Sequence, residues 1–108
     1  MGITYKKNSD DTRESPILKI YNLINSKIKN KIFVCDPMVS DFAKKILKNI
    51  NFVSLQELNK KSFYKKFDLC FIGSNHDIFN YDEIKKKFKF IFDSRNSFKK
   101  LGKNIKII

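Results

Sequence analysis

Short apolar runs alternate with helix-forming segments along the whole chain, and this alternation limits the fold more than any other feature. Strands that are separated by helices need crossover connections, and such connections make neighbouring strands parallel. We therefore predict an α/β fold, a three-layer Rossmann-like domain whose mainly parallel sheet is flanked by helices. The predicted strands lie at residues 3–5, 31–35, 52–53, 68–72, 89–92 and 104–108.

Capping residues mark where the predicted helices begin. Ser15 is expected to cap the first helix, with Pro16 at its first position, where the missing N–H costs nothing. Ser40 or Asp41 is expected to start the second helix, and Ser54 has the spacing of a capping box for a third. Apolar residues at helical spacing form the predicted inner faces: Ile17, Ile20, Tyr21, Ile24 and Ile28, then Phe42, Ala43, Ile46, Leu47 and Ile50, and in a last helix Ile84 and Phe88.

Almost every polar feature other than lysine follows directly after a predicted strand. These features lie at residues 6–13, 36–37, 73–77 and 93–96. The carboxyl ends of parallel strands meet at one edge of a sheet, and ligands bind outside that edge in open α/β folds. We therefore predict that these loops form one ligand-binding rim.

The predicted rim lacks the common signatures of catalysis. It has no G-x-G-x-x-G sequence for a dinucleotide, no Cys and His spacing for zinc, and no nucleophile elbow. His76 is interpreted as a loop histidine that its neighbours satisfy, with a catalytic base as the alternative. Asp10, Asp11 and Asp77 are interpreted as turn and capping residues, with a carboxylate cluster for a metal as the alternative. We expect no catalytic residue and no metal site in this chain.

Arginine is rare in this chain, and both arginines fall in the predicted rim. Among 23 lysines and arginines, only Arg13 and Arg95 are arginine. A guanidinium is needed where a planar fork meets a phosphate or carboxylate through two parallel hydrogen bonds. Together with Tyr5 and Lys6, the arginines make the rim cationic and aromatic, which favours binding a nucleotide over making or breaking bonds.

The net charge of +12 raises the alternative of a basic nucleic-acid-binding module. The lysines are scattered, however, and the longest run, at residues 85–87, is typical of a solvated helix face. We therefore do not expect nucleic acid as the partner. A non-catalytic assembly domain is a further alternative.

The cysteines and the apolar runs indicate the compartment. Cys35 and Cys70 each lie inside an apolar run and are expected to be reduced core thiols, with a disulfide as the alternative. No apolar run has the length of a membrane span, and the N-terminus lacks the apolar segment of a secretion signal. We predict a cytoplasmic protein without a membrane partner.

Four motifs follow the predicted strands in order. Residues 5–16 read aromatic-Lys, a polar loop and Asp-x-Arg-Glu-Ser-Pro, residues 36–37 read Asp-Pro, residues 75–79 contain His-x-x-Phe, and residues 92–96 contain Asp-x-Arg-Asn. In this order and spacing they resemble the C-terminal, UDP-binding domain of the UDP-glucose/GDP-mannose dehydrogenase family. The residues of the first motif are most similar to those of UDP-N-acetylhexosamine dehydrogenases of the UDP-N-acetylmannosamine type.

The resemblance implies roles for individual residues. Tyr5, Lys6, Arg95 and Asn96 would bind the nucleotide sugar, and Arg13 would reach an NAD cofactor that an N-terminal domain holds. Some relatives carry a second arginine where Asn96 stands. The full enzyme of this family oxidises the C6 alcohol of a UDP-sugar to a carboxylate in two NAD-dependent steps, expected here to supply a precursor of surface polysaccharide.

The resemblance also implies that residues 1–108 are only the C-terminal nucleotide-sugar-binding domain of a UDP-sugar dehydrogenase. The NAD-binding domain and the central helical domain, which carries the catalytic cysteine and lysine, are not part of it. We therefore expect the chain to be inactive by itself and to have those domains as partners. The full-length enzyme is expected to be a homo-oligomer, and an exposed apolar patch is expected where the other domains dock.

Overall fold

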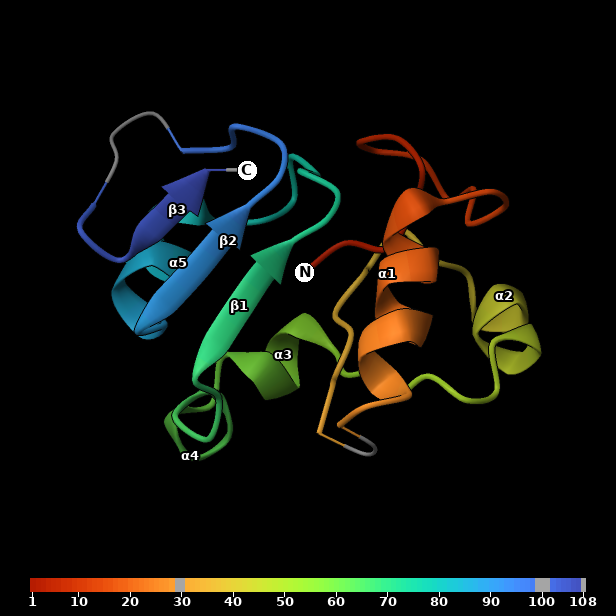
Figure 1. Cartoon of the computed structure of the whole chain (residues 1–108), viewed down its shortest axis with the longest axis horizontal. Helices are drawn as coiled ribbons and strands as arrows, with labels where there is room; N and C mark the ends of the chain where they lie inside the picture. The colour runs from red at the N-terminus through yellow and green to blue at the C-terminus, as the bar shows by residue number, and fades with distance from the viewer. Residues whose placement is uncertain (29–30, 99–101, 108) are drawn as a thin grey trace.

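The computed structural model describes residues 1–28, 31–98 and 102–107. Its centre is a parallel sheet whose strands lie side by side in chain order (Figure 1). Helix α5 (Tyr81–Lys87) connects the first two strands and lies behind the second and third in this view. The predicted parallel sheet is therefore confirmed in the second half of the chain. Its strands are β1 (Leu69–Ile72), β2 (Phe90–Asp93) and β3 (Ile105–Ile107).

The first half of the chain continues this sheet through single pairings instead of regular strands. The Met1 amine donates to the Phe71 carbonyl of β1 at 2.8 Å. On the other side, the Gly2 N–H donates to the Cys35 carbonyl at 2.9 Å. Residues 1–2 therefore lie between β1 and the segment that ends at Cys35.

A parallel bridge between Val34 and Phe52 extends the sheet further outward. The predicted strand regions are thus arranged in the order third, second, first, fourth, fifth, sixth, which is the order of a doubly wound Rossmann sheet. The switch point of such a sheet lies between its first and fourth strands. The strands predicted at 3–5 and 31–35 are wrong in extent, because the first pairing falls on residues 1–2 and only Val34 and Cys35 of the second pair. The minimal strand predicted at 52–53 is confirmed, since both of its residues pair with Val34.

All three predicted helix starts are confirmed, but only two of the capping serines bond through their side chains. The Ser40 and Ser54 hydroxyls accept backbone N–H groups three residues ahead, at 3.1 and 3.0 Å. Ser15 makes no such bond, because its hydroxyl donates to the Ile3 carbonyl at 2.7 Å and ties the helix start to the first strand region. The helices besides α5 are α1 (Pro16–Asn25), α2 (Asp41–Ile46), α3 (Leu55–Leu58) and α4 (Lys61–Tyr64), of which α4 was not predicted.

Consecutive residues of the second strand region point to opposite faces of the sheet. Val34 packs in a core cluster with Tyr21 of α1, whereas Cys35 packs with Leu58 of α3 and Ile84 of α5. Helices therefore lie on both sides of the sheet. This arrangement confirms the predicted three-layer, Rossmann-like architecture.

Both cysteines are buried core residues, as predicted. Cys35 and Cys70 are 3% and 5% exposed, and both are free thiols. Burial raises the pKa of each thiol to about 11, because the thiolate would lose its hydration. Reactions that need a thiolate are therefore suppressed at neutral pH.

One face of β1 and β2 is left open by the described residues. Helix α5 lies behind β2, and no helix covers the front of β1 or β2 in Figure 1. The apolar side chains on this side, which we call the front face, are Leu69, Phe71, Phe90 and Phe92. Leu69 is 47% exposed and Phe90 is 64% exposed. An apolar surface of this kind is where association with another chain segment is expected.

The predicted inner faces of α1 and α2 are wrong in part. Tyr21 of α1 is buried, but Ile20 and Ile24 are more than a third exposed and line one hollow that reaches the front face. Phe42 and Ile46 of α2 are 74% and 64% exposed, whereas Ala43 of the same predicted face packs against the core cluster that contains Tyr21 and Val34. Among the residues that the structure describes, no helix is long and apolar enough to cross a membrane.

Candidate functional site

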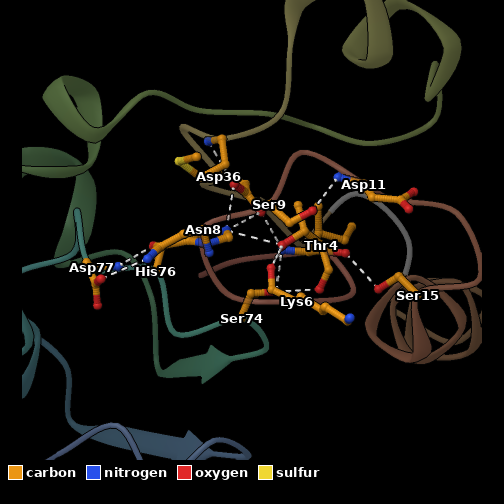
Figure 2. Close-up of polar contacts among 12 residues, drawn as sticks. Thr4, Lys6, Asn8, Ser9, Asp11, Ser15, Asp36, Ser74, His76 and Asp77 are labelled. Atoms are coloured by element: carbon orange, nitrogen blue, oxygen red, sulfur yellow. Dashed lines mark hydrogen bonds and ion pairs between the residues drawn. The ribbon is translucent and has the colours of Figure 1, made fainter.

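The loops after the first, second and fourth strand regions meet at the switch point of the sheet. They contribute Thr4, Asp36, Ser74 and His76, each no more than 1% exposed, and Figure 2 shows these side chains gathered together. The predicted convergence of the strand-end loops is therefore confirmed here. Polar side chains are buried at such a place only when they are hydrogen-bonded, so their contacts define how the loops are held.

His76 and Asp36 lie at the centre of this network. His76 Nε2 is 3.0 Å from Asp36 Oδ1, and Nδ1 accepts the backbone N–H of Asn8 at 2.7 Å (Figure 2). Asp36 also accepts the N–H groups of Ile3 (2.7 Å) and Met38 (3.0 Å). Both ring nitrogens of His76 are occupied and the ring is enclosed. The interpretation as a satisfied loop histidine is thereby confirmed over that of a catalytic base.

Asn8 holds the first loop to the loop after β1. Its φ of 57° lies in the left-handed region, which asparagine tolerates better than most residues. Its side-chain amide donates to Asp77 Oδ2 at 2.7 Å, and its amide oxygen accepts the Asp77 N–H at 2.8 Å. The Asn8 amide and, after it, the Lys7 ammonium hold the pKa of the Asp77 carboxyl below its usual value. Asp77 therefore serves to join two loops.

Thr4 and Ser74 join the same two loops from the inside. The Ser74 hydroxyl donates to the Thr4 carbonyl, and the Thr4 hydroxyl donates to the Lys6 carbonyl at 2.8 Å. The backbone at Lys6 is therefore fixed, although its side chain is exposed. Sequence reasoning missed both hydroxyl residues. Their one signal is a small polar residue after an apolar run, which is equally typical of a solvated turn.

Arg95 bridges the loop after β2 to the other two loops. Its Nε donates to the Gly73 carbonyl at 2.9 Å, and its Nη2 donates to the Tyr5 carbonyl at 3.0 Å. The buried carboxylate of Asp93 fixes the turn that carries Arg95 by accepting the N–H groups of Arg95 (3.0 Å) and Ser97 (2.6 Å). The guanidinium is therefore held in one orientation against the first loop.

The residues that the resemblance assigns to the nucleotide sugar lie on the outside of this network. Tyr5 is 46% exposed, and Lys6 beside it is also exposed. Asn96 follows Arg95 in a left-handed conformation with a φ of 54°. The structure thus brings an aromatic ring, an ammonium and a guanidinium to adjoining positions. This set can bind phosphate through its cations and stack a base on its ring.

Arg13 lies apart from this group. Its Nε and Nη2 donate to the two carboxylate oxygens of Asp11 at 3.1 and 3.3 Å, and its side chain is 88% exposed. Its hydrogen bond lowers the pKa of the Asp11 carboxyl, and the carboxylate in turn raises the pKa of Arg13. An ion pair this exposed adds little to stability. The predicted cofactor residue is therefore free of the buried network.

Comparison with known proteins points to one family. Residues 1–100 match the model of the UDP-glucose/GDP-mannose dehydrogenase family, UDP binding domain. The chain is also similar to a UDP-D-ManNAc dehydrogenase from Pyrococcus horikoshii (27% identity, TM-score 0.67) and to a UDP-N-acetyl-mannosamine dehydrogenase from Staphylococcus aureus (30% identity, TM-score 0.68). These matches cover 98% and 99% of this chain, which spans 23% and 24% of the two solved structures. No curated protein sequence matches the chain.

Proposed function

The chain belongs to the UDP-glucose/GDP-mannose dehydrogenase family, and on that premise we propose that residues 1–108 bind the nucleotide sugar for an NAD-dependent UDP-sugar 6-dehydrogenase. The enzyme would oxidise the sugar C6 alcohol to a carboxylate for a surface polysaccharide precursor. The names of both similar solved structures favour an N-acetylhexosamine as the sugar. The observation that carries the proposal is the bridge from the Arg95 guanidinium to the Tyr5 carbonyl, next to Lys6.

Arg95 and Lys6 suit the diphosphate of a nucleotide sugar. A guanidinium has five N–H donors, so the two carbonyl contacts of Arg95 leave donors for a phosphate. Because those contacts already fix the Arg95 side chain, binding a phosphate costs little additional conformational entropy. Lys6 adds an exposed charge on a backbone that Thr4 holds. The Tyr5 ring and the Asn96 amide would then contact the base or ribose.

Arg13 is proposed to contact the cofactor. Its exposed guanidinium can exchange the Asp11 carboxylate for a phosphate of NAD presented by another domain, since both anions fit the same planar fork. NAD would accept the hydride from the sugar, and this chain would contribute only charge and position. The catalytic groups, the NAD-binding domain and the surface for homo-oligomer formation would lie in the rest of a longer chain.

The proposal is tested by titrating the chain with UDP and with UDP-N-acetylmannosamine in a calorimeter. Lys6→Ala and Arg95→Ala are each expected to weaken binding about tenfold or more, the loss typical of one charged hydrogen-bonding group. Lys45→Ala, which removes an exposed lysine from α2, is the matched control and should bind as the unmodified chain does. Equal affinity in the unmodified chain and in the Lys6 and Arg95 variants would contradict the proposed site.

A further inference from the structure

We infer that His76 is a positioning residue that fixes the Tyr5–Lys6 loop for nucleotide-sugar binding without touching the ligand. This inference rests on the proposed function. Its basis is the chain of contacts from Asp36 through the imidazole to the backbone of Asn8. His76 is 0% exposed, so it can act on a ligand only through the loop that it holds.

The contact with Asn8 settles which nitrogen of the imidazole carries the proton. A backbone N–H can only donate, so Nδ1, which lies 2.7 Å from the Asn8 nitrogen, must be the unprotonated acceptor. The single proton of the neutral ring is then on Nε2 and points to Asp36, 3.0 Å away. The ring is thus an oriented link with a donor on one side and an acceptor on the other.

Asp36 sets the orientation of this link. Its carboxylate is itself anchored to backbone N–H groups at Ile3 and Met38, which lie at the ends of two strand regions. Both partners of the Asp36–His76 pair are fully buried, where a lost contact is not replaced by water. The imidazole therefore fixes the backbone of Asn8 relative to the sheet.

Asn8, once fixed, restricts the residues before it. Three hydrogen bonds clamp it to the loop after β1: its N–H to His76, its amide to the Asp77 carboxylate, and its oxygen from the Asp77 N–H. Tyr5 and Lys6 lie between this clamp and Thr4, which the Ser74 hydroxyl holds. Without the His76 contact, only the exposed bonds to Asp77 would hold the Asn8 end of the Tyr5–Lys6 segment. Thr4 and Arg95 would still hold its other end.

Two variants separate the halves of this link. In His76→Gln the longer amide reaches the place of Nε2 and can donate to Asp36, but no acceptor remains for the Asn8 N–H. In His76→Asn the amide oxygen takes the place of Nδ1 and accepts the Asn8 N–H, but the side chain does not reach Asp36. Each variant keeps one contact of the imidazole and loses the other.

UDP affinity and urea unfolding are measured on the 108-residue chain and on both variants. His76→Gln is expected to weaken UDP binding about tenfold, and His76→Asn less than about threefold, although both lose stability. A merely structural histidine would lower affinity in step with stability in both variants. That result, or tight binding by His76→Gln, would overturn the inference.

Nitrogen NMR gives a second readout that does not need the ligand. His76 is the only histidine of the chain, so labelling histidine with nitrogen-15 gives the NMR signals of a single imidazole. The proton is expected on Nε2, and the Asn8 amide is expected to exchange slowly in the unmodified chain and in His76→Asn but fast in His76→Gln. A proton on Nδ1 would overturn the inference. Absence of UDP binding by the unmodified chain, with these spectra as expected, would instead refute the proposed function and the positioning role with it.

Discussion

The loop network at the switch point and the front face of the sheet are opposite in what they bury. In the loop network, charged and polar side chains such as Asp36 and His76 are no more than 1% exposed and are fully hydrogen-bonded. On the front face, large apolar side chains such as Leu69 and Phe90 are 47% and 64% exposed. The loop network beneath the candidate site is buried and hydrogen-bonded, while the apolar sheet beside it is open.

The topology of the chain explains this difference. Right-handed crossovers place their helices on one face of a sheet while the strand order runs one way, and on the other face once the order reverses. Helix α1 belongs to the first direction and α5 to the second. The front of β1 and β2 therefore receives no crossover helix. At the same switch point the loops of the two halves of the sheet meet, and buried polar contacts join them.

The largest effect is expected from removing a carboxylate of the loop network. Asp93→Ala leaves the Arg95 N–H, the Ser97 N–H and the Ser97 hydroxyl without their acceptor, and should lower the free energy of unfolding by roughly 4 kcal/mol. Urea unfolding measures the loss. Asp10→Ala, which removes an exposed carboxylate from the same rim, is the control and should leave the free energy of unfolding unchanged. An equal loss of unfolding free energy in both variants would mean that a buried carboxylate of the network stabilises the fold no more than an exposed one.

Neighbouring residues of β2 test the other side of the comparison. Ile91 is 1% exposed and points into the core, whereas Phe90 is 64% exposed on the front face. Ile91→Ala should lower the free energy of unfolding by about 3 kcal/mol, since it leaves a cavity in the core. Phe90→Ala should lower it by less than about 1 kcal/mol, although it removes the larger side chain. A large loss in Phe90→Ala would show that the front face is covered in solution, and sedimentation of both variants would identify a self-associated form.

Sequence reasoning was most reliable where a structure depends on local pattern. The apolar run at 68–72 and the serines at 40 and 54 predicted β1 and two helix caps, because these signals act within a few residues. Helix α4 was missed, since Lys60 before it offers no side-chain cap. The strand at 31–35 was overextended, since only Val34 and Cys35 pair with neighbouring segments.

The candidate site shows the same division. Tyr5, Lys6 and Arg95 could be proposed from the sequence because they lie in motifs after strands. The contacts that hold them could not, because Ser74 meets Thr4 only when loops 70 positions apart approach one another. Likewise, nothing near Arg95 in the sequence indicates that its guanidinium would bind the Tyr5 carbonyl.

The smallest effect is expected at the outer end of the first loop, where Arg13 and Asp11 form an exposed pair. Arg13→Ala should raise the pKa of the Asp11 carboxyl only part of the way to its usual value, because the side-chain hydrogen bond is lost while the backbone N–H of residue 13 still donates to Asp11. A carboxyl with a depressed pKa stabilises the fold above its unfolded pKa, and this contribution is lost as pH falls through the folded pKa. Because solvent screens this pair, the free energy of unfolding at pH 7 should stay unchanged within error.

An NMR pH titration of the Asp11 side chain measures the shift in Arg13→Ala, and urea unfolding at pH 7 checks the stability. UDP affinity should also stay unchanged, since Arg13 is proposed to serve the cofactor and lies outside the network that fixes Tyr5 and Lys6. Arg13→Lys keeps the charge without the planar fork and should restore part of the depressed pKa. Weaker UDP binding in Arg13→Ala would place Arg13 in the nucleotide site and contradict its proposed role at the cofactor.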